Sequence, residues 1–368
     1  MKACGIVTEY NPFHNGHIHH IEESRRITGC DVLIAVMSGN FTQRGEPAII
    51  DKYERTKAAL EHGVDLVLEL PFLYVNQSAT QFASAGVKIL DLAKCTDMVF
   101  GSETNNLEEL REIVEMPIGI DNLKENMKTG ISFPKAYGLM AREYLPNDIL
   151  AISYLKALQD TDITPHTIQR TTEYHGENME GSIASAKAIR KAFLNHEDYT
   201  ETTPMQLDES HVVQMKDYYP MLRTLLLTLN LSYLSSLFLV DEGIENHLKK
   251  QAELYDNYED FLNAAVTRRY TKARIQRTLV SILTQMERVK IKKIPPIDFI
   301  QVLGFNETGR EYLKELKKQE VKVASRFNQI PKPYRELQYR SDVLYSMFFP
   351  DQNEFLKRAI QMPVMQDK

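Results

Sequence analysis

Two histidines near the N-terminus have the spacing and surroundings needed to act on a triphosphate. His14 and His17 form an HxGH motif with Gly16, after a Tyr-Asn-Pro-Phe turn that follows a short apolar run. A helical pattern begins at the motif, and a helix N-terminus offers free N–H groups and a positive dipole end to phosphate. Gly16 lets the backbone approach a phosphate, and two imidazoles can donate hydrogen bonds to α-phosphate oxygens as charge builds up in the transition state. We therefore predict that His14 and His17 are catalytic in a displacement at phosphorus without a covalent protein nucleophile.

The alternative for this segment is a surface cluster or a metal site made of His14, His17, His19 and His20. Metal ligation is disfavoured because no acidic residue stands at HExxH-type spacing. The order of strand, turn, motif and helix favours phosphate chemistry, and we predict no metal bound by these side chains.

A second segment with phosphate-binding chemistry begins at Ser182 and ends at Arg190. It has the pattern of a helix start, where Ser185, Lys187 and Arg190 could bind the β- and γ-phosphates. The alternative is an ordinary serine-capped amphipathic helix. With HxGH upstream, we favour the phosphate site.

The elements that must position these motifs alternate between strands and helices. This alternation predicts βαβ units with right-handed crossovers, which give an α/β, doubly wound parallel sheet. Ligands bind such sheets beyond the C-terminal strand ends, near the topological switch point. Strands are expected over residues 3–7, 31–37, 66–70, 98–100 and 164–169, and helices from the HxGH motif to 27 and over 51–61, 78–92, 147–158 and 182–193.

The chain has 368 residues, which suggests two domains. The segment 195–206 is polar, contains Pro204 and lacks periodicity, so we place the boundary there. This predicts one domain over 1–200 and a second, mainly α-helical domain over 208–368.

Composition is that of a globular protein, with 43% hydrophobic and 26% charged residues. Cys4, Cys30 and Cys95 lack metal-ligand spacing and are expected to be reduced, buried thiols. No signal-peptide pattern is present, and the uncharged stretch 224–240 is expected to be a core helix rather than a membrane span. We expect a cytoplasmic protein without a membrane partner.

With both motifs in place, the chain resembles the bacterial tRNA(Met) cytidine acetate ligases of the HxGH nucleotidyltransferase superfamily. One departure is Asp148, where the family often has a second asparagine after Asn147; another is Lys187, where the superfamily pattern usually has a hydroxyl. The resemblance extends over most of the chain, including residues 5–17, 35–60, 65–72, 100–103, 146–158, 183–190, 268–279 and 301–310 and the region of Arg170, Tyr174 and His175.

The resemblance implies an HxGH nucleotidyltransferase domain that activates acetate with ATP, forms acetyl-adenylate and acetylates N4 of the wobble cytidine of elongator tRNA(Met). It implies Mg²⁺ with the ATP, no use of acetyl-CoA and no DNA partner, and it leaves the contact at Asp148 in doubt. Together with the second motif, it gives these expected ATP-binding residues: Val7, Thr8, Glu9, Tyr10, Asn11, Pro12, Phe13, His14, Asn15, Gly16, His17, Ile18, His19, His20, Gly101, Asn147, Arg170, Ser185 and Lys187.

Candidate RNA contacts come from local basic residues, because a net charge of −6 gives no overall attraction to nucleic acid. Residues 268–293 contain nine basic residues and one acid, Glu287. Solvated or internally paired charges are an equally good interpretation of this run. The polar loop 43–47 is either a lid, an RNA contact or a structural turn, and Lys52 and Arg55 after it are either RNA contacts or solvated charges. The candidate tRNA contacts are Arg44, Lys52, Arg268, Arg269, Lys272, Arg274 and Arg277.

Two other functions remain open on the sequence. A small-molecule adenylyltransferase that makes a dinucleotide or coenzyme precursor would explain HxGH but not the basic helical half. An RNA-binding protein with a degenerate nucleotide site is disfavoured because both histidines are present.

Overall fold

A single sheet of eight strands organises the protein, in the order β5-β4-β1-β2-β3-β6-β7 with β8 beside β6. The computed structural model describes residues 1–115, 146–169, 183–361 and 363–366. The strands are β1 (Ala3–Thr8), β2 (Val32–Ser38), β3 (Leu66–Leu70), β4 (Asp97–Ser102), β5 (Thr164–Gln169), β6 (Ile300–Phe305), β7 (Val323–Ala324) and β8 (Val364–Met365).

The helices of the N-terminal half alternate with these strands, as the sequence predicts. They are α1 (Asn15–Thr28), α2 (Lys52–Glu61), α3 (Phe72–Val75), α4 (Ala79–Leu92), α5 (Leu107–Glu115), α8 (Pro146–Leu158) and α9 (Ala186–Leu194). The largest boundary difference from the prediction is at α9, which begins at Ala186 with Ser185 as its N-cap, and not at Ser182. Ser185 accepts a hydrogen bond from the amide of Ala188, which satisfies a donor that the helix start leaves open.

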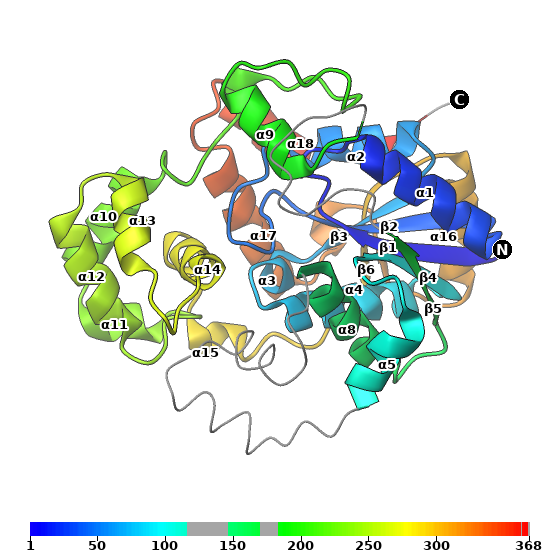
Figure 1. Cartoon of the computed structure of the whole chain (residues 1–368), viewed down its shortest axis with the longest axis horizontal. Coiled ribbons are helices and arrows are strands. Elements are labelled where there is room, and N and C mark those ends of the chain that lie inside the picture. The colour runs from blue at the N-terminus through cyan, green and yellow to red at the C-terminus, as the bar shows by residue number, and fades with distance from the viewer. Residues whose placement is uncertain (116–145, 170–182, 362, 367–368) are drawn as a thin grey trace.

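The first five strands are parallel and run in the order 3-2-1-4-5, which confirms the doubly wound sheet. β2 and β3 are buried along their whole length because helices cover both faces. α1 packs against β1 and β2, α4 also packs against both strands, and Figure 1 shows the two helices on opposite sides of the sheet. The chain reverses its direction of winding between β1 and β4, so the switch point lies at the ends of these strands.

The C-terminal half is largely helical, but it also completes the sheet. Its helices are α10 (Tyr219–Thr228), α11 (Leu231–Ser236), α12 (Ile244–Leu254), α13 (Tyr258–Ala265), α14 (Lys272–Leu283), α15 (Arg288–Ile291), α16 (Glu307–Lys318), α17 (Lys332–Tyr345) and α18 (Gln352–Ala359). Helices α10 to α14 lie together to one side of the sheet (Figure 1). The stretch 224–240, expected as one helix, contains the end of α10 and all of α11, because Asn230 begins a new helix as its N-cap.

The return of the chain to the sheet differs from the expected division into 1–200 and 208–368. Strand β6 pairs antiparallel with β3, with Leu66 opposite Phe305, and β7 and β8 pair with β6. The run Ile300–Phe305 is mostly apolar without alternation, and such a short run fits a buried strand and a helix segment equally well. The helices α10 to α14 are therefore followed by residues that belong to the sheet.

Two expectations about composition can be compared with the structure. All three cysteines are free and buried, as expected. Among the described residues, no helix combines the length and the apolar character that crossing a bilayer requires.

Candidate active site

The loop between β1 and α1 places the HxGH motif at the switch point of the sheet. Tyr10 has a positive φ of 51°, the Asn11–Pro12 peptide is cis, and the loop ends at His14. The side-chain oxygen of Asn11 accepts a hydrogen bond from the amide of Ile49 at 2.7 Å, and Arg190 of α9 donates one to its carbonyl oxygen. The loop is therefore tied to the segment after β2 and to the second motif.

His14 and His17 are held by backbone hydrogen bonds that fix which ring nitrogen carries the proton. Nδ1 of His14 accepts from the amide of Gly16, and Nδ1 of His17 accepts from the amide of His14, both at 3.1 Å. A neutral imidazole that accepts at Nδ1 carries its proton on Nε2. The two ring centroids lie 3.8 Å apart. Both neutral rings thus carry their proton on Nε2, and they lie side by side at the N-terminus of α1.

Aromatic packing and a glycine give these rings their positions. The ring of Tyr10 contacts that of His17 edge-on at 4.7 Å, and Phe13 lies 5.7 Å from the same ring. A Cβ atom on Gly16 would lie 2.9 Å from the His14 ring, so glycine leaves the space that this ring occupies. The sequence interpretation gave Gly16 a role toward phosphate; the structure adds a role toward His14.

The remaining residues of the expected ATP segment surround the same point. Val7 and Thr8 end β1, and Asn15, Ile18 and His19 lie on the first turns of α1. Nε2 of His20 lies 3.3 Å from the carbonyl oxygen of Val99 in the neighbouring strand β4.

The loop after β4 forms the other side of the switch point. Gly101 lies near the end of β4, and Asn147 donates from its backbone and side-chain nitrogens to the carboxylate of Glu103. Asp148 is buried and accepts hydrogen bonds from the hydroxyl of Ser102 and the amide of Glu103. The carboxylate of Asp148 therefore holds the loop after β4. Arg170, Tyr174, His175 and Ser182 lie outside the described residues.

The second motif approaches the first through Arg190. Lys187 is exposed on α9, whereas Ser185 is buried as its cap. Burial lowers the pKa of Arg190, with Glu46 and Glu9 acting in the opposite direction. Since Arg190 donates to Asn11 in the HxGH loop, the two predicted phosphate-binding segments are adjacent in space.

Residues 201–203 also cover the HxGH loop, which sequence reasoning missed. The amide of Asn15 donates to the carbonyl oxygen of Thr202 at 3.0 Å, and the hydroxyl of Thr203 donates to that of Phe13 at 2.5 Å. The segment is polar and aperiodic, so its sequence is typical of a linker, and no local signal identifies this contact.

The polar loop 43–47 is a structural turn that docks on α14. The amide of Gly45 donates to the carbonyl oxygen of Thr42, and Gln276 of α14 donates to the carboxylate of Glu46. Arg277 donates to the carbonyl oxygen of Gln43 and is buried, and burial lowers its pKa to about 10. The expected RNA contact at Arg277 is therefore corrected: it joins α14 to this turn. Arg44 is exposed.

Gly45 gives this docking a direct test. It has φ +76°, and an added Cβ would lie 2.4 Å from the backbone nitrogen of Arg277. Gly243 has φ +80° and no atom within 4 Å of such a Cβ. A positive φ costs a non-glycine residue roughly 1–2 kcal/mol, and overpacking adds about 1–3 kcal/mol. We expect Gly45→Ala to lower the free energy of unfolding in urea clearly more than Gly243→Ala; equal losses would show that the turn does not pack tightly on α14.

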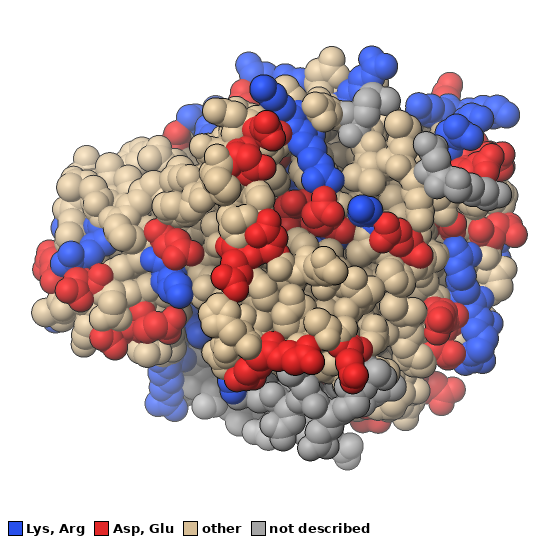
Figure 2. Space-filling view, turned by 90° about the horizontal axis from the view of Figure 1, so that it is seen from above, with Lys and Arg blue, Asp and Glu red and all other residues tan. Residues whose placement is uncertain are grey.

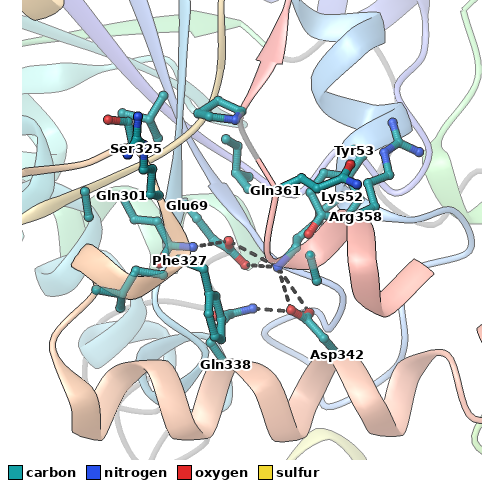
Figure 3. A pocket seen from close by; sticks show the side chains of 17 residues that line it. Lys52, Tyr53, Glu69, Gln301, Ser325, Phe327, Gln338, Asp342, Arg358 and Gln361 are labelled. Atoms are coloured by element: carbon teal, nitrogen blue, oxygen red, sulfur yellow. Dashed lines mark hydrogen bonds and ion pairs between the residues drawn. The ribbon is translucent and has the colours of Figure 1, made fainter. Parts of the chain in front are cut away.

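Lys52 and Arg55 are buried, which corrects the expectation that they are RNA contacts or solvated charges. Nζ of Lys52 lies 3.0 Å from Oε1 of Glu69 and 3.1 Å from Oδ2 of Asp342. Figure 3 shows the lysine between these two carboxylates. These carboxylates raise the pKa of Lys52, although burial alone would lower it. Arg55 donates to the carbonyl oxygens of Glu9 and Gly39. Neither cation is available to RNA phosphates.

The cavity beside Lys52 is not a nucleotide site. It holds about 30 Å³, the space of about one water, and it is lined by Glu69, Gln301, Gln338 and Asp342 among others. None of its lining residues belongs to the HxGH loop.

The basic run 268–293 is partly paired with acids from the connection between α11 and α12. Arg269 pairs with Glu242, and Arg274 and Arg288 both pair with Asp241, at 2.7–3.0 Å. Arg268, Arg269 and Lys272 are exposed, whereas Arg274 is only partly so. On the face shown in Figure 2, basic and acidic side chains are interspersed. Internal pairing therefore accounts for much of the run, and the exposed cations at its start remain candidates for RNA.

The sequence is similar to a known family and to individual proteins over most of its length. Residues 1–359 match the model of a family described as HIGH nucleotidyl transferase. The chain is 38% identical over 348 residues to the tRNA(Met) cytidine acetate ligase of Geobacillus sp. (strain WCH70). This alignment covers 86% of this chain and 87% of that protein. It is 40% identical over 349 residues to the ligase of the same description from Thermoanaerobacter sp. (strain X514), with 86% of each chain covered.

A solved structure is similar over the full length of both chains. The crystal structure of Thermotoga maritima TmcAL bound with alpha-thio ATP has a TM-score of 0.88 and 30% sequence identity. The apo form of that protein has a TM-score of 0.89 at the same identity. The fold is therefore that of an ATP-binding relative.

Proposed function

This chain belongs to the tRNA(Met) cytidine acetate ligase family of HIGH nucleotidyl transferases, and on this premise we propose that it activates acetate with ATP and acetylates N4 of the wobble cytidine of elongator tRNA(Met). The observation that carries the proposal is the pair of Nε2–H groups on His14 and His17 at the N-terminus of α1. The small-molecule adenylyltransferase is not favoured, because the relatives that match over most of the chain are described as tRNA ligases.

The first half-reaction is a displacement at the α-phosphorus of ATP. An acetate oxygen forms a bond to phosphorus, the bond to the bridging oxygen breaks, and diphosphate leaves with the electron pair. Negative charge on the phosphate oxygens grows in this transition state, and donors fixed in advance stabilise it without reorganisation. His14 and His17 are such donors, and the N-terminus of α1 adds its dipole.

In the second half-reaction, N4 attacks the acetyl carbon and AMP leaves. The mixed anhydride reacts with water, so the site must exclude it. Residues 201–203 contact the HxGH loop from outside and support this requirement. A wobble base lies in a single-stranded loop and can be turned out into a pocket. A tRNA substrate also places the proposed activity in the cytoplasm.

Mg²⁺ enters the proposal with the ATP. Among the described residues, no group of three or more His, Cys, Asp or Glu side chains could hold a metal ion. Mg²⁺ is commonly bound by substrate phosphates, water and one or two carboxylates, and this arrangement needs no protein cage. When bound, the ion would neutralise charge on the leaving diphosphate.

Diphosphate exchange into ATP tests this function without tRNA. We expect exchange that depends on acetate and is unaffected by nicotinate mononucleotide or a phosphopantetheine. Exchange that depends on one of those acceptors instead would support a small-molecule adenylyltransferase. No exchange with any of them would support an RNA-binding protein with a degenerate site.

The exposed cations at the start of the basic run are proposed to hold the tRNA body, with the chemistry carried out at the HxGH site. Replacing Arg268, Arg269 and Lys272 with alanine should weaken tRNA binding. The slope of the logarithm of the binding constant against the logarithm of the salt concentration should become less steep by about 0.7–0.9 for each phosphate that the variant no longer neutralises. Acetate-dependent exchange should be retained. Filter binding across a salt series measures both quantities.

A matched control replaces three exposed lysines on α16, Lys314, Lys317 and Lys318. It removes the same charge from another part of the molecule and should leave the salt slope unchanged. If both triple variants behaved alike, the RNA contacts would have to be sought elsewhere, beginning at the exposed Arg44.

A further inference from the structure

Glu9 lies in the loop that leads to both histidines, and only one of its two carboxylate oxygens accepts a hydrogen bond from a described residue. Glu9 follows the last residue of β1, and its Oε1 accepts a hydrogen bond from the amide of Gln43 at 2.6 Å. No described residue donates a hydrogen bond to its other oxygen, Oε2, and the side chain is partly exposed. One oxygen therefore fixes the orientation of the carboxylate, and the other is open to a donor that enters the site.

The cations around Glu9 do not form an ion pair with it in the described structure. Arg55 of α2 donates to the backbone carbonyl oxygen of Glu9, and Arg190 of α9 donates to that of Asn11. Arg44 of the turn 43–47 also acts on Glu9 through its charge, and Tyr154 of α8 lies near enough to be affected by it. The carboxylate of Glu9 therefore lies in a positive environment without a direct ion pair to any of these three arginines in the described structure.

The environment of Glu9 makes its carboxylate a better proton acceptor. Burial raises the pKa of Glu9, and the opposing effects of the Gln43 amide and the charges of Arg44, Arg55 and Arg190 do not cancel it. General bases work best when their pKa lies near the operating pH. The position of Glu9 beside the histidines and its raised pKa are both consistent with a general base.

The second half-reaction needs such a group. The lone pair of cytosine N4 is delocalised into the ring, so the amine becomes a good nucleophile only as it loses a proton. As the bond from N4 to the acetyl carbon forms, the N–H becomes acidic and requires an acceptor. The bond from that carbon to the phosphate oxygen then breaks, and AMP leaves with the electron pair.

We propose that Glu9 is a catalytic residue of acyl transfer: its open carboxylate oxygen accepts the proton that N4 loses and later releases it to water. This inference rests on the proposed function, and it assigns to Glu9 a step separate from adenylation, for which His14 and His17 are the donors.

The test separates the two half-reactions in Glu9→Gln. The amide oxygen of glutamine can still accept the Gln43 amide, so the variant keeps the structural contact and loses the base. Because Glu9 belongs to the expected ATP-binding segment, we expect some loss of acetate-dependent diphosphate exchange, but a much smaller loss than that of acyl transfer. In a single turnover with acetyl-adenylate formed before tRNA is added, acetylation should be slower by about 10²–10⁴-fold, the usual contribution of a general base.

The pH profile of the single turnover gives a readout that a structural role would not move. The parent rate should fall as the pH drops through the raised pKa of Glu9, and Glu9→Gln should lack this acid limb. Glu9→Asp, which keeps a carboxylate, should recover part of the rate. Glu46→Gln serves as the control, since the carboxylate of Glu46 accepts a structural hydrogen bond from Gln276 and the variant should show no selective loss of transfer.

Three results would overturn the inference. Transfer by Glu9→Gln at the parent rate would show that no base is needed there. A loss of exchange as large as that of transfer would place Glu9 in adenylation or in binding of Mg²⁺–ATP. If the parent itself lacked acetate-dependent exchange, the proposed function would fail first, and the role of Glu9 with it.

Discussion

His17→Ala should reduce acetyl-adenylate formation by about 10²-fold or more, with only a modest loss of ATP affinity. In the proposed mechanism, Nε2–H of His17 donates to phosphate oxygens whose charge grows in the transition state, so this interaction is stronger there than with bound ATP. Rapid-quench measurement of diphosphate release gives the rate, and equilibrium dialysis gives the affinity for ATP.

Two further variants make this result specific. His17→Gln places an amide N–H near the position of Nε2 and should retain more activity than His17→Ala. His247→Ala removes an imidazole from α12, in the helical half, and should leave the rate unchanged. Near-normal adenylate formation by folded His17→Ala would refute the assigned role, and a matched loss in rate and ATP affinity would indicate uniform binding instead.

Lys52→Ala should be the most destabilising of the substitutions considered. Lys52 is 2% exposed and lies between Glu69 and Asp342, which are 0% and 1% exposed. Removing the cation leaves two buried carboxylates facing each other, and breaking a buried pair in this way costs about 3–5 kcal/mol. Urea unfolding at neutral pH measures the loss.

The stability loss caused by Lys52→Ala can be compared at different pH values and with the loss caused by breaking an exposed ion pair. Burial raises the pKa of Glu69, and Asp342 raises it further while Lys52 opposes both effects. A group with a raised pKa in the folded state stabilises at low pH and loses that contribution as pH rises, so the penalty of Lys52→Ala should shrink toward acid. Lys88→Ala, which breaks the exposed pair with Asp91, should change stability by about 1 kcal/mol or less. Equal effects of both substitutions would contradict the account of the buried network.

The parallel core of the fold could be predicted because its signals are local. Strands such as Leu66–Leu70 are short, mostly apolar runs between helical patterns, and β3 has these bounds in the structure. The order of elements then limits the topology through right-handed crossovers. The same reasoning places HxGH at the end of β1, where the structure has it.

What could not be predicted depends on contacts between distant segments. Strand β6 pairs with β3 across more than 200 residues of sequence, and nothing in Ile300–Phe305 indicates which strand is its partner. Lys52 resembles a surface lysine in sequence because Asp342, one of its two carboxylate partners, lies 290 residues away. The positive charge of Arg274 is visible in the sequence, whereas its pairing with Asp241 is a tertiary contact.

The role of the turn 43–47 was open for the same reason. Its composition suits a lid, an RNA contact or a turn, and the packing of Gly45 and Glu46 against α14 is a tertiary contact that the sequence does not reveal. This turn also orients Glu9 through the amide of Gln43. The HxGH loop and the helical half are thus connected through backbone and side-chain contacts that the periodicity of the sequence does not reveal.

The central claim is that free acetate, activated by ATP, is the acyl donor for the wobble cytidine. The most direct measurement is mass spectrometry of that nucleoside after incubation of unmodified elongator tRNA(Met) with the protein, ATP, isotopically labelled acetate and unlabelled acetyl-CoA. We expect N4-acetylcytidine carrying the label of acetate, formed only when ATP is present. Unlabelled acetylcytidine formed from acetyl-CoA without ATP, or an unmodified wobble cytidine under all conditions, would contradict the account.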